Sequence, residues 1–337
     1  MARHLQDSMN FNNPKFLNQL QIKMRYFNFI RTTTLIAGIL LLNACGSDTN
    51  KNRLNITGAF ALYPLAIKWS DVYKKTHPNI RFDISGGGAG KGLTDVLASA
   101  ADIGMFSRDL TPEEKAKGIW SIAVAIDAVI PTVSAQNPSL KALLESGLSQ
   151  EQFKTIFLSG AQLTWGSQLG TADSGKINVY TRSDAAGAAD TWAKYLGSKQ
   201  ERIKGIGIYG DPGLADAIAK DPEGIGFNNV AYIYDAKTGH KYPGIEVVPI
   251  DIDGNHKIDT DENFYKNSDA ILNAIAKGKY PAPPARELYF ISKGKPVDPE
   301  VIAFLKWILT DGQAFVKEAG FVPLEPNKIA EQLSKLN

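Results

Sequence analysis

Three loops of small residues, each between a strand-like and a helix-like stretch, could bind an anion. They are Gly58–Tyr63, Ser85–Gly90 and Arg182–Gly187. Loops at the carboxyl ends of parallel strands line the crevice where α/β proteins bind ligands, and a helix N-terminus there offers free N–H groups to an anion. Small residues let the backbone approach to hydrogen-bonding distance. Each loop alone is an ordinary βα turn, but three together, one carrying Arg182, favour an oxyanion site.

Residues 251–262 follow the pattern of an EF-hand calcium loop. Oxygen ligands fall at the expected positions, with side chains from Asp251, Asp253, Asn255, Asp259 and Glu262 and the carbonyl of Lys257. The departure is His256, which stands where the sharp turn normally requires Gly. An acidic surface turn is the alternative, because Asp, Asn and Gly also favour turns. We expect a structural Ca²⁺ here and no cofactor for chemistry.

Nothing in the sequence indicates an enzyme, because no nucleophile has a partner base in a recognisable pattern. Gly205–Gly210 matches the dinucleotide motif GxGxxG. However, Glu201–Lys204 before it is not strand-like and Asp211–Gly213 after it is typical of a turn, so a dinucleotide site is not expected. The single cysteine excludes an internal disulfide and a Cys-rich metal site.

Composition and charge indicate a globular protein that does not bind nucleic acid. The chain has 337 residues, of which 44% are hydrophobic and 21% charged, and its net charge is +2. Residues 1–44 hold five basic residues and one acid, so the rest of the chain has a net charge of −2. A protein that binds a polyanion by bulk charge would be basic in its folded part.

The segment 1–44 has the features of a lipoprotein signal. Arg25 and Arg31 precede a short apolar run, Leu35–Leu42, and Ala44 stands before Cys45. The run is about half as long as the roughly 20 residues that a membrane span needs. We expect Cys45 to be the acylated first residue of the mature protein, carrying palmitate, and 45–53 to be a tether. We interpret residues 1–23 as lying before the true start of translation.

Strand-like and helix-like stretches alternate along the rest of the chain. Ile119–Ile130 is a long strand-like stretch, and Asp298 has the features of an N-cap before a helix. This alternation predicts an α/β fold with mostly parallel sheets flanked by helices. The length favours two lobes. With linkers near Ser134–Pro138 and Tyr280–Pro284, we expect 54–133 plus 285–337 in lobe 1 and 134–284 in lobe 2.

A family resemblance rests on motifs that recur in order along nearly the whole mature chain. They are Gly58–Leu65 with Lys68-Trp69, the Gly86–Gly90 loop, Asp102–Arg108, Phe153–Phe157 with Trp165, Thr181–Gly187 and Phe304–Trp307. In these the chain resembles the periplasmic phosphate-binding proteins of high-affinity phosphate ABC importers. The resemblance implies the two-lobed type II periplasmic-binding-protein fold, closing on phosphate held by N–H groups, hydroxyls, an Arg and an Asp.

The resemblance also implies the site residues. They are the backbone donors Ala61, Leu62, Gly87, Gly88, Gly90, Gly187 and Ala188, the hydroxyl of Ser107, and the charged residues Arg108, Arg182 and Asp184. Several hydroxyls of the family pattern are replaced here, as at Leu62, Gly87 and Ala188, and Arg108 stands where the family often has an acceptor Asp. Asp184 is therefore interpreted either as the acceptor or as a residue that orients Arg182.

We therefore expect a monomeric, lipid-anchored extracytoplasmic protein that binds inorganic phosphate for an ABC permease and is not an enzyme. Another tetrahedral oxyanion, such as sulfate or molybdate, is the first alternative. The others are a calcium-stabilised surface lipoprotein that binds a macromolecule, and a phosphatase-like hydrolase on the same fold.

Overall fold

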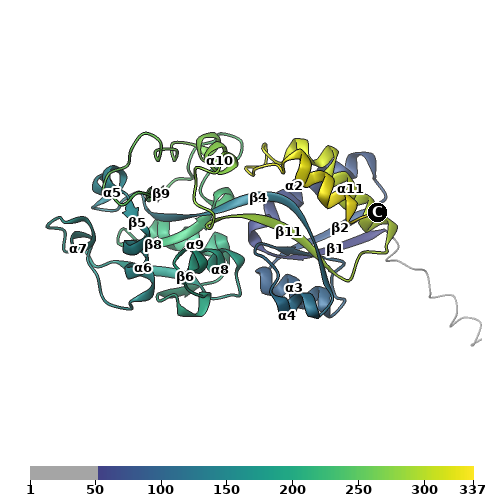
Figure 1. Cartoon of the computed structure of the whole chain (residues 1–337), viewed down its shortest axis with the longest axis horizontal. Coiled ribbons are helices and arrows are strands. Elements are labelled where there is room, and N and C mark those ends of the chain that lie inside the picture. The colour runs from purple at the N-terminus through teal and green to yellow at the C-terminus, as the bar shows by residue number, and fades with distance from the viewer. Residues whose placement is uncertain (1–51) are drawn as a thin grey trace, which may run out of the picture. The chain divides into compact units, whose positions relative to one another are not determined.

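Two long antiparallel strands run through the middle of the molecule and belong to both of its halves (Figure 1). The computed structural model describes residues 52–337, which form one compact unit. The two strands are β4 (Ile119–Ser134) and β11 (Ala285–Lys293). Because each of these strands passes from one lobe to the other, the strands of both lobes form one continuous sheet. Its strand order is β2-β1-β3-β11-β4-β8-β6-β7, and β9 pairs with β4.

Lobe 1 is built around three parallel strands. β1 (Arg53–Gly58) lies between β2 (Arg81–Gly86) and β3 (Ile103–Phe106). Helices and short 3₁₀ turns accompany these strands: η1 (Phe60–Leu62), α2 (Tyr63–Thr76), α3 (Ala89–Leu97), α4 (Pro112–Ala116), α11 (Pro299–Leu309), η4 (Asp311–Phe315) and α12 (Pro326–Ser334). Both ends of the described chain therefore belong to lobe 1 (Figure 1).

Lobe 2 is built from the middle of the chain. β6 (Asn178–Arg182) lies between β7 (Ile206–Ile208) and β8 (Gly224–Asn229), parallel to both. The smaller strands are β5 (Leu148–Ser149), β9 (Ile245–Val247) and β10 (Ile250–Asp251). The helices are α5 (Leu140–Ser146), α6 (Gln150–Leu158), α7 (Trp165–Leu169), α8 (Gly187–Tyr195), η2 (Gln200–Arg202), α9 (Gly210–Lys220), η3 (Val230–Tyr232) and α10 (Ser268–Ala276).

Buried hydrophobic residues form two clusters, one in each lobe. On β4, Ala125 belongs to the cluster of lobe 1 and Ala128 to the cluster of lobe 2. Tyr280 still belongs to the cluster of lobe 2, and Leu288 on β11 belongs to that of lobe 1. Each cluster has its own aromatic centre, with Trp69 in lobe 1 and Trp192 in lobe 2. The sequence-based limits of the lobes stay a prediction.

The predicted α/β class with mostly parallel sheets and flanking helices is confirmed. The long strand expected over Ile119–Ile130 continues to Ser134 as β4, and the carboxylate of Asp298 accepts a hydrogen bond from the N–H of Glu300 at the start of α11.

Two local predictions were wrong. Arg53, which was assigned to the tether, begins β1. Asp211–Gly213, which was interpreted as a turn, lies in the first turn of α9, where the fixed φ of Pro212 is compatible with a helix. The signal segment 1–44, Cys45 and the tether up to residue 51 lie outside the described residues. Among residues 52–337, no helix combines the length and apolar character that a membrane span requires.

Candidate functional site

A small pocket lies where loops of lobe 1 meet loops of lobe 2. It is narrow, and no space within it is large enough to hold a water molecule. Lobe 1 contributes Ala59, Phe60, Ala61, Gly88, Ala89 and Ser107. Lobe 2 contributes Arg182, Ala186, Gly187, Ala188, Asp211 and Asn229. All three loops singled out in the sequence therefore reach one place, and both lobes must be together to complete it.

Arg182 brings a buried positive charge to the pocket. It is the last residue of β6 and is 5% exposed. Its Nε and Nη2 atoms donate to the two carboxylate oxygens of Asp184 at 2.8 and 2.6 Å, and its Nη1 donates to Asp211. Burial would lower the pKa of Arg182, but the two carboxylates hold that pKa above its usual value. The guanidinium is therefore permanently charged and fixed in orientation.

Asp184 has the geometry of a residue that orients Arg182. It lies two residues beyond the end of β6, and its Oδ1 also accepts the N–H of Gly210 at 3.1 Å. It does not belong to the pocket lining. The fork-to-fork pairing with Arg182 leaves most of its acceptor positions committed within the protein.

The pocket contains a second acid, Asp211. This residue is 2% exposed, and its carboxylate accepts hydrogen bonds from Arg182 and from the side chain of Asn229. Burial raises the pKa of Asp211, whereas the neighbouring charges of Arg182 and Arg286 oppose that rise. The pocket thus pairs one cation with a carboxylate that still has acceptor positions.

The polar network continues from the pocket to the two strands that join the lobes. The side-chain oxygen of Asn229 accepts a hydrogen bond from Arg286 on β11. Arg286 in turn faces Asp127 on β4, with 3.6 Å between Nη2 and Oδ2. Burial raises the pKa of Asp127 to about 7, although Arg286 opposes this. Polar contacts therefore run without a gap from Arg182 to the crossing strands.

Two helices begin at the pocket lining. Gly187 and Ala188 are the first residues of α8, and Ala89 is the first residue of α3. The first N–H groups of a helix have no intrahelical partner and are attractive to anions. The sequence analysis named Gly187 and Ala188 singly and included Ala89 within the Ser85–Gly90 loop.

The glycine loop of lobe 1 uses several of its N–H groups within the protein. Gly87 and Gly88 both donate to the carbonyl of Gly58, at 2.9 and 3.1 Å, and Gly90 donates to the carbonyl of Ala185 at 3.0 Å. The last of these bonds crosses from α3 to lobe 2. Of these loop glycines, Gly88 lines the pocket, whereas Gly87 and Gly90 lie outside its lining.

Ser107 of lobe 1 and Gly187 of lobe 2 lie against each other at the pocket. A Cβ atom on Gly187 would collide with the Oγ and the backbone of Ser107. Ser107 is buried and lines the pocket, so its hydroxyl is placed to contact a ligand there. Gly187 is therefore required by the close approach and not by an unusual backbone conformation.

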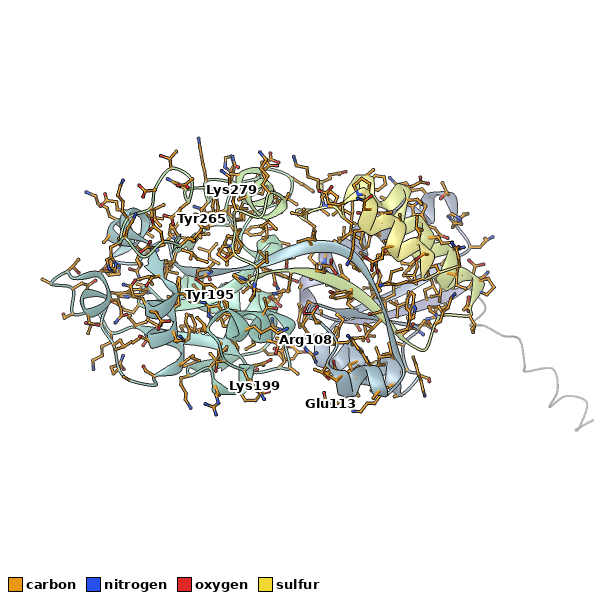
Figure 2. The ribbon with its side chains drawn as sticks, viewed as in Figure 1. Arg108, Glu113, Tyr195, Lys199, Tyr265 and Lys279 are labelled. Carbon is orange, nitrogen blue, oxygen red and sulfur yellow. The ribbon has the colours of Figure 1, made fainter. Side chains whose placement is uncertain are left out.

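Leu62 and Arg108 also lie outside the pocket lining, in addition to Asp184, Gly87 and Gly90. Leu62 is fully buried in the hydrophobic cluster of lobe 1. Arg108 turns toward α4, where it pairs with both carboxylate oxygens of Glu114 at 2.9 and 2.7 Å and covers the ring of Phe106. Figure 2 labels Arg108 in lobe 1, close to Glu113 of α4.

Sequence reasoning missed Asp211 and Asn229. A signal was available, because Asp211 directly follows Gly210 and belongs to a fourth strand–loop–helix unit, formed by β7 and α9. The strand is only three residues long, and Ile206 is 53% exposed, so no buried alternation marks it. Asn229 ends β8 and directly precedes η3.

The acidic loop 251–262 forms a separate cluster in lobe 2. Carboxylate oxygens of Asp251, Asp253 and Glu262 lie within 4.8 Å of one another. Asp251 and Glu262 are 2% and 6% exposed, and neither forms an ion pair within residues 52–337. His256 adopts a φ of 63°, the left-handed conformation that the sixth position of such a loop requires.

The rest of the loop is ordered by its own polar contacts. Asn255 donates to Asp253 and Asp259 at 3.0 and 2.9 Å, and the Lys257 side chain pairs with Asp259 at 2.6 Å. The N–H of Ile258 donates to the carbonyl of Glu145 in α5, so the loop is attached to this lobe and not to a second loop of its kind. Three carboxylates of the loop thus group together, whereas Asp259 is paired with Lys257.

A pocket between two lobes of an α/β protein is a common place for a small ligand to bind. The family model of the PBP superfamily domain matches residues 43–312. The chain therefore belongs to the PBP superfamily, that of the periplasmic binding proteins.

Curated relatives extend over most of the chain. The phosphate-binding protein PstS of Bacillus subtilis (strain 168) is 27% identical over 290 residues, which cover 85% of this chain and 86% of that protein. PstS of Pseudomonas aeruginosa (strain PAO1) is 26% identical over 304 residues, covering 84% and 86%. Their names agree with the expectation of a binding protein, not an enzyme.

Solved structures show the same fold. An ABC transporter substrate-binding protein with bound phosphate from Clostridium perfringens has a TM-score of 0.66 at 21% identity, covering 81% of this chain and 100% of its own. An ABC-type phosphate transport receptor from Vibrio cholerae has a TM-score of 0.57 at 18% identity, also covering 81% and 100%.

Proposed function

We propose that this protein is an extracytoplasmic solute-binding protein that captures inorganic phosphate between its lobes and delivers it to an ABC permease. The observation that carries the proposal is the pocket shared by both lobes, in which Arg182 and the starts of α3 and α8 face one another. The names of the relatives and the phosphate held by the Clostridium perfringens protein support phosphate as the ligand.

Binding would proceed by closure of the lobes on the anion. Contacts already join the lobes beside the pocket, including the hydroxyl of Tyr232 donating to the carbonyl of Phe60 at 2.9 Å and Gly90 donating to Ala185. An anion that contacts Arg182 and α8 in one lobe and α3 and Ser107 in the other binds only the closed state well. It therefore shifts the population toward closure.

The proposal assigns different roles to the predicted residues. Arg182 supplies the charge, Asp184 orients it, and Ser107 supplies a hydroxyl. Gly187, Ala188 and Ala89 supply N–H groups, with Ala61 and Gly88 forming the walls. Leu62, Gly87, Gly90 and Arg108 support these loops without contacting the ligand.

Titration calorimetry on the purified protein, freed of bound anion, tests the ligand. We expect phosphate to bind, and Arg182→Ala to weaken that binding at least tenfold, because a charge-assisted contact is worth roughly 1.5–3 kcal/mol. Arg202→Ala, an exposed arginine in the same lobe, is the matched control and retains wild-type affinity. Wild-type affinity in Arg182→Ala would contradict the proposed site.

The same titration separates the alternatives. Binding of sulfate or molybdate in place of phosphate would keep the fold and change the substrate. Steady release of phosphate from an ester would indicate a hydrolase. A folded protein that binds none of these anions would favour a surface protein that recognises a macromolecule.

The proposal includes a lipid anchor at Cys45, outside the described residues. It rests on the basic and apolar segments that precede this cysteine. Metabolic labelling with palmitate should mark the wild-type protein in the membrane fraction, and Cys45→Ser should lose both the label and the membrane association. Equal labelling of the two proteins would refute acylation at this position.

We also propose that loop 251–262 holds a structural Ca²⁺ through Asp251, Asp253, Asn255, the Lys257 carbonyl, Asp259 and Glu262. Support comes from the grouping of three carboxylates, two of them buried without a cationic partner in the described chain. Calcium in excess should raise the melting temperature of the wild-type protein. Glu262→Gln should abolish that rise, whereas Asp261→Asn, on the exposed side of the same loop, should retain it. An equal rise in all three proteins would contradict the site.

A further inference from the structure

The side chain of Phe60 reaches from one lobe to the other. Phe60 begins η1 in lobe 1, and its ring lies between a glycine of each lobe. A Cβ atom on Gly86, the last residue of β2, would collide with the ring, and one on Gly210, the first residue of α9, would lie 3.3 Å from two of its carbons. Both glycines therefore leave room for the ring.

Three contacts attach Phe60 to lobe 2. Its ring centroid lies 5.8 Å from that of Tyr209 in an edge-to-face arrangement, with an angle of 89° between the ring planes. The guanidinium carbon of Arg182 lies 5.6 Å from the same ring centroid. The backbone carbonyl of Phe60 accepts the hydroxyl of Tyr232 at 2.9 Å. Edge-to-face rings attract each other, and so do a cation and the ring that it faces.

Phe60 also lies between two spaces. One is the anion pocket, and the other is an apolar groove of about 720 Å³ that both lobes line, with Tyr63 from lobe 1 and Pro212 from lobe 2. Of all the residues that line these two spaces, Phe60 alone lines both. It therefore forms part of the wall between Arg182 and the groove. Charges attract more strongly where water is excluded, so this wall strengthens the attraction of Arg182 for an anion.

Tyr209 is placed to contact Phe60 and not to fill a core. It is 59% exposed, and it lines neither the anion pocket nor the groove. Within residues 52–337, Phe60 of the opposite lobe is its aromatic partner. Removing the ring of Tyr209 therefore weakens a contact between the lobes without touching the ligand or either hydrophobic cluster.

We propose that Phe60 is a latch of the closed state, whose ring, held by Arg182 and Tyr209, sets how slowly bound phosphate dissociates. The inference rests on the proposed function and adds a control on the same site. The contacts of the ring join residues of different lobes, so they exist only while the lobes are together. They therefore stabilise the closed state and slow release. Association begins in the open state and does not depend on them.

The test measures release and capture of phosphate separately. Wild-type protein is loaded with radiolabelled phosphate, an excess of unlabelled phosphate is added, and rapid filtration follows the loss of label. Phe60→Leu keeps an apolar side chain but removes the ring, and we expect its dissociation rate to rise at least tenfold with an unchanged association rate. Tyr209→Ala should dissociate about threefold faster than wild type.

Two further variants show whether the contact between the lobes is responsible. Phe82→Leu changes another half-buried phenylalanine of lobe 1, whose partners Tyr73 and Phe304 belong to the same lobe, and it should release phosphate at the wild-type rate. Phe60→Leu combined with Tyr209→Ala should dissociate at about the rate of Phe60→Leu alone, because Tyr209 has already lost its partner ring. Multiplied effects in the double variant would contradict the latch.

A folded Phe60→Leu protein with the wild-type dissociation rate would overturn the inference and leave the proposed function intact. Thermal unfolding of each variant verifies that it is folded. If Phe60→Leu does not fold, Tyr209→Ala decides, since an unchanged dissociation rate in that exposed variant would refute the latch. Wild-type protein that captures no phosphate would overturn the proposed function, and the inference with it.

Discussion

Asp127 on β4 and Arg286 on β11 face each other across the two strands that connect the lobes, with 3.6 Å between their nearest charged atoms. This distance is too long for a hydrogen bond. Arg286 also donates to Asn229, which contacts Asp211 in the pocket. The pair therefore connects the crossing strands with the candidate anion site.

The first prediction concerns the pH dependence of stability. The pKa of Asp127 is raised by burial from 3.8 to about 7, so the folded protein holds this proton over a range where the unfolded chain releases it. The stabilisation that Asp127 contributes should therefore be complete below about pH 4 and should be lost as the pH rises toward 7. The group's contribution is about 4 kcal/mol in total.

Urea unfolding of wild-type protein and Asp127→Asn between about pH 4 and pH 8 measures this effect. The amide cannot ionise, so the variant should lose the fall in unfolding free energy that belongs to Asp127. Parallel pH profiles for the two proteins would show that Asp127 is ionised in the folded state.

The second prediction concerns the contact between Gly187 and Ser107. Gly187→Ala should leave folding nearly unchanged, because alanine is well accommodated in the first turn of α8. Its Cβ collides with Ser107, so the variant should resist closure and weaken phosphate binding at least tenfold. Calorimetry and thermal unfolding of the same sample separate the two effects. A melting temperature that falls while phosphate affinity is retained would show that the contact between Gly187 and Ser107 stabilises the fold and does not control binding.

The third prediction separates Arg108 from the ligand. Its pairing with Glu114 is largely buried, and the carboxylate holds the pKa of Arg108 above its usual value although burial acts against this. Arg108→Ala should lower the unfolding free energy by about 2 kcal/mol and leave phosphate affinity unchanged. A large loss of phosphate affinity in a stable Arg108→Ala variant would show that Arg108 contacts the ligand.

The fourth prediction concerns the strained position in the acidic loop. His256 adopts a φ of 63°, which costs a non-glycine residue about 1 kcal/mol. His256→Gly should therefore raise calcium affinity, because the loop reaches its binding conformation without that strain. Calcium titration of both proteins provides the measurement, and a weaker affinity in the glycine variant would show that the imidazole itself supports the loop.

Regular patterns made most of the fold predictable from the sequence. The long apolar stretch from Ile119 has the length and alternation of a strand, and Asp298-Pro299 is a strong helix start, so β4 and α11 were predicted correctly. The two lobes followed from the total length. Local signals of this kind depend on residues that are neighbours in sequence.

The candidate site was only partly predictable, because its residues meet through tertiary contacts. Arg182 and Gly187 could be named from one loop, but the position of Asp211 depends on how α9 is attached to β6 and β8. The short exposed strand before it carries no pattern. Likewise, nothing local distinguishes Asp184 as an orienting residue until its contacts with Arg182 are seen.

The position of β11 has a consequence for the way the chain assembles. Residues 285–293 lie between β3 and β4 in the sheet, although they follow β4 by about 150 residues of chain. Until this strand arrives, β3 and β4 each expose an unpaired edge, which is a template for wrong pairing. Lobe 2 is built from the end of β4 and the sequence that follows it, with Val322 as the exception, so most of its core can form earlier. A chain synthesised from its N-terminus must therefore keep residues 53–133 soluble and unfinished until residues 285–293 have been made.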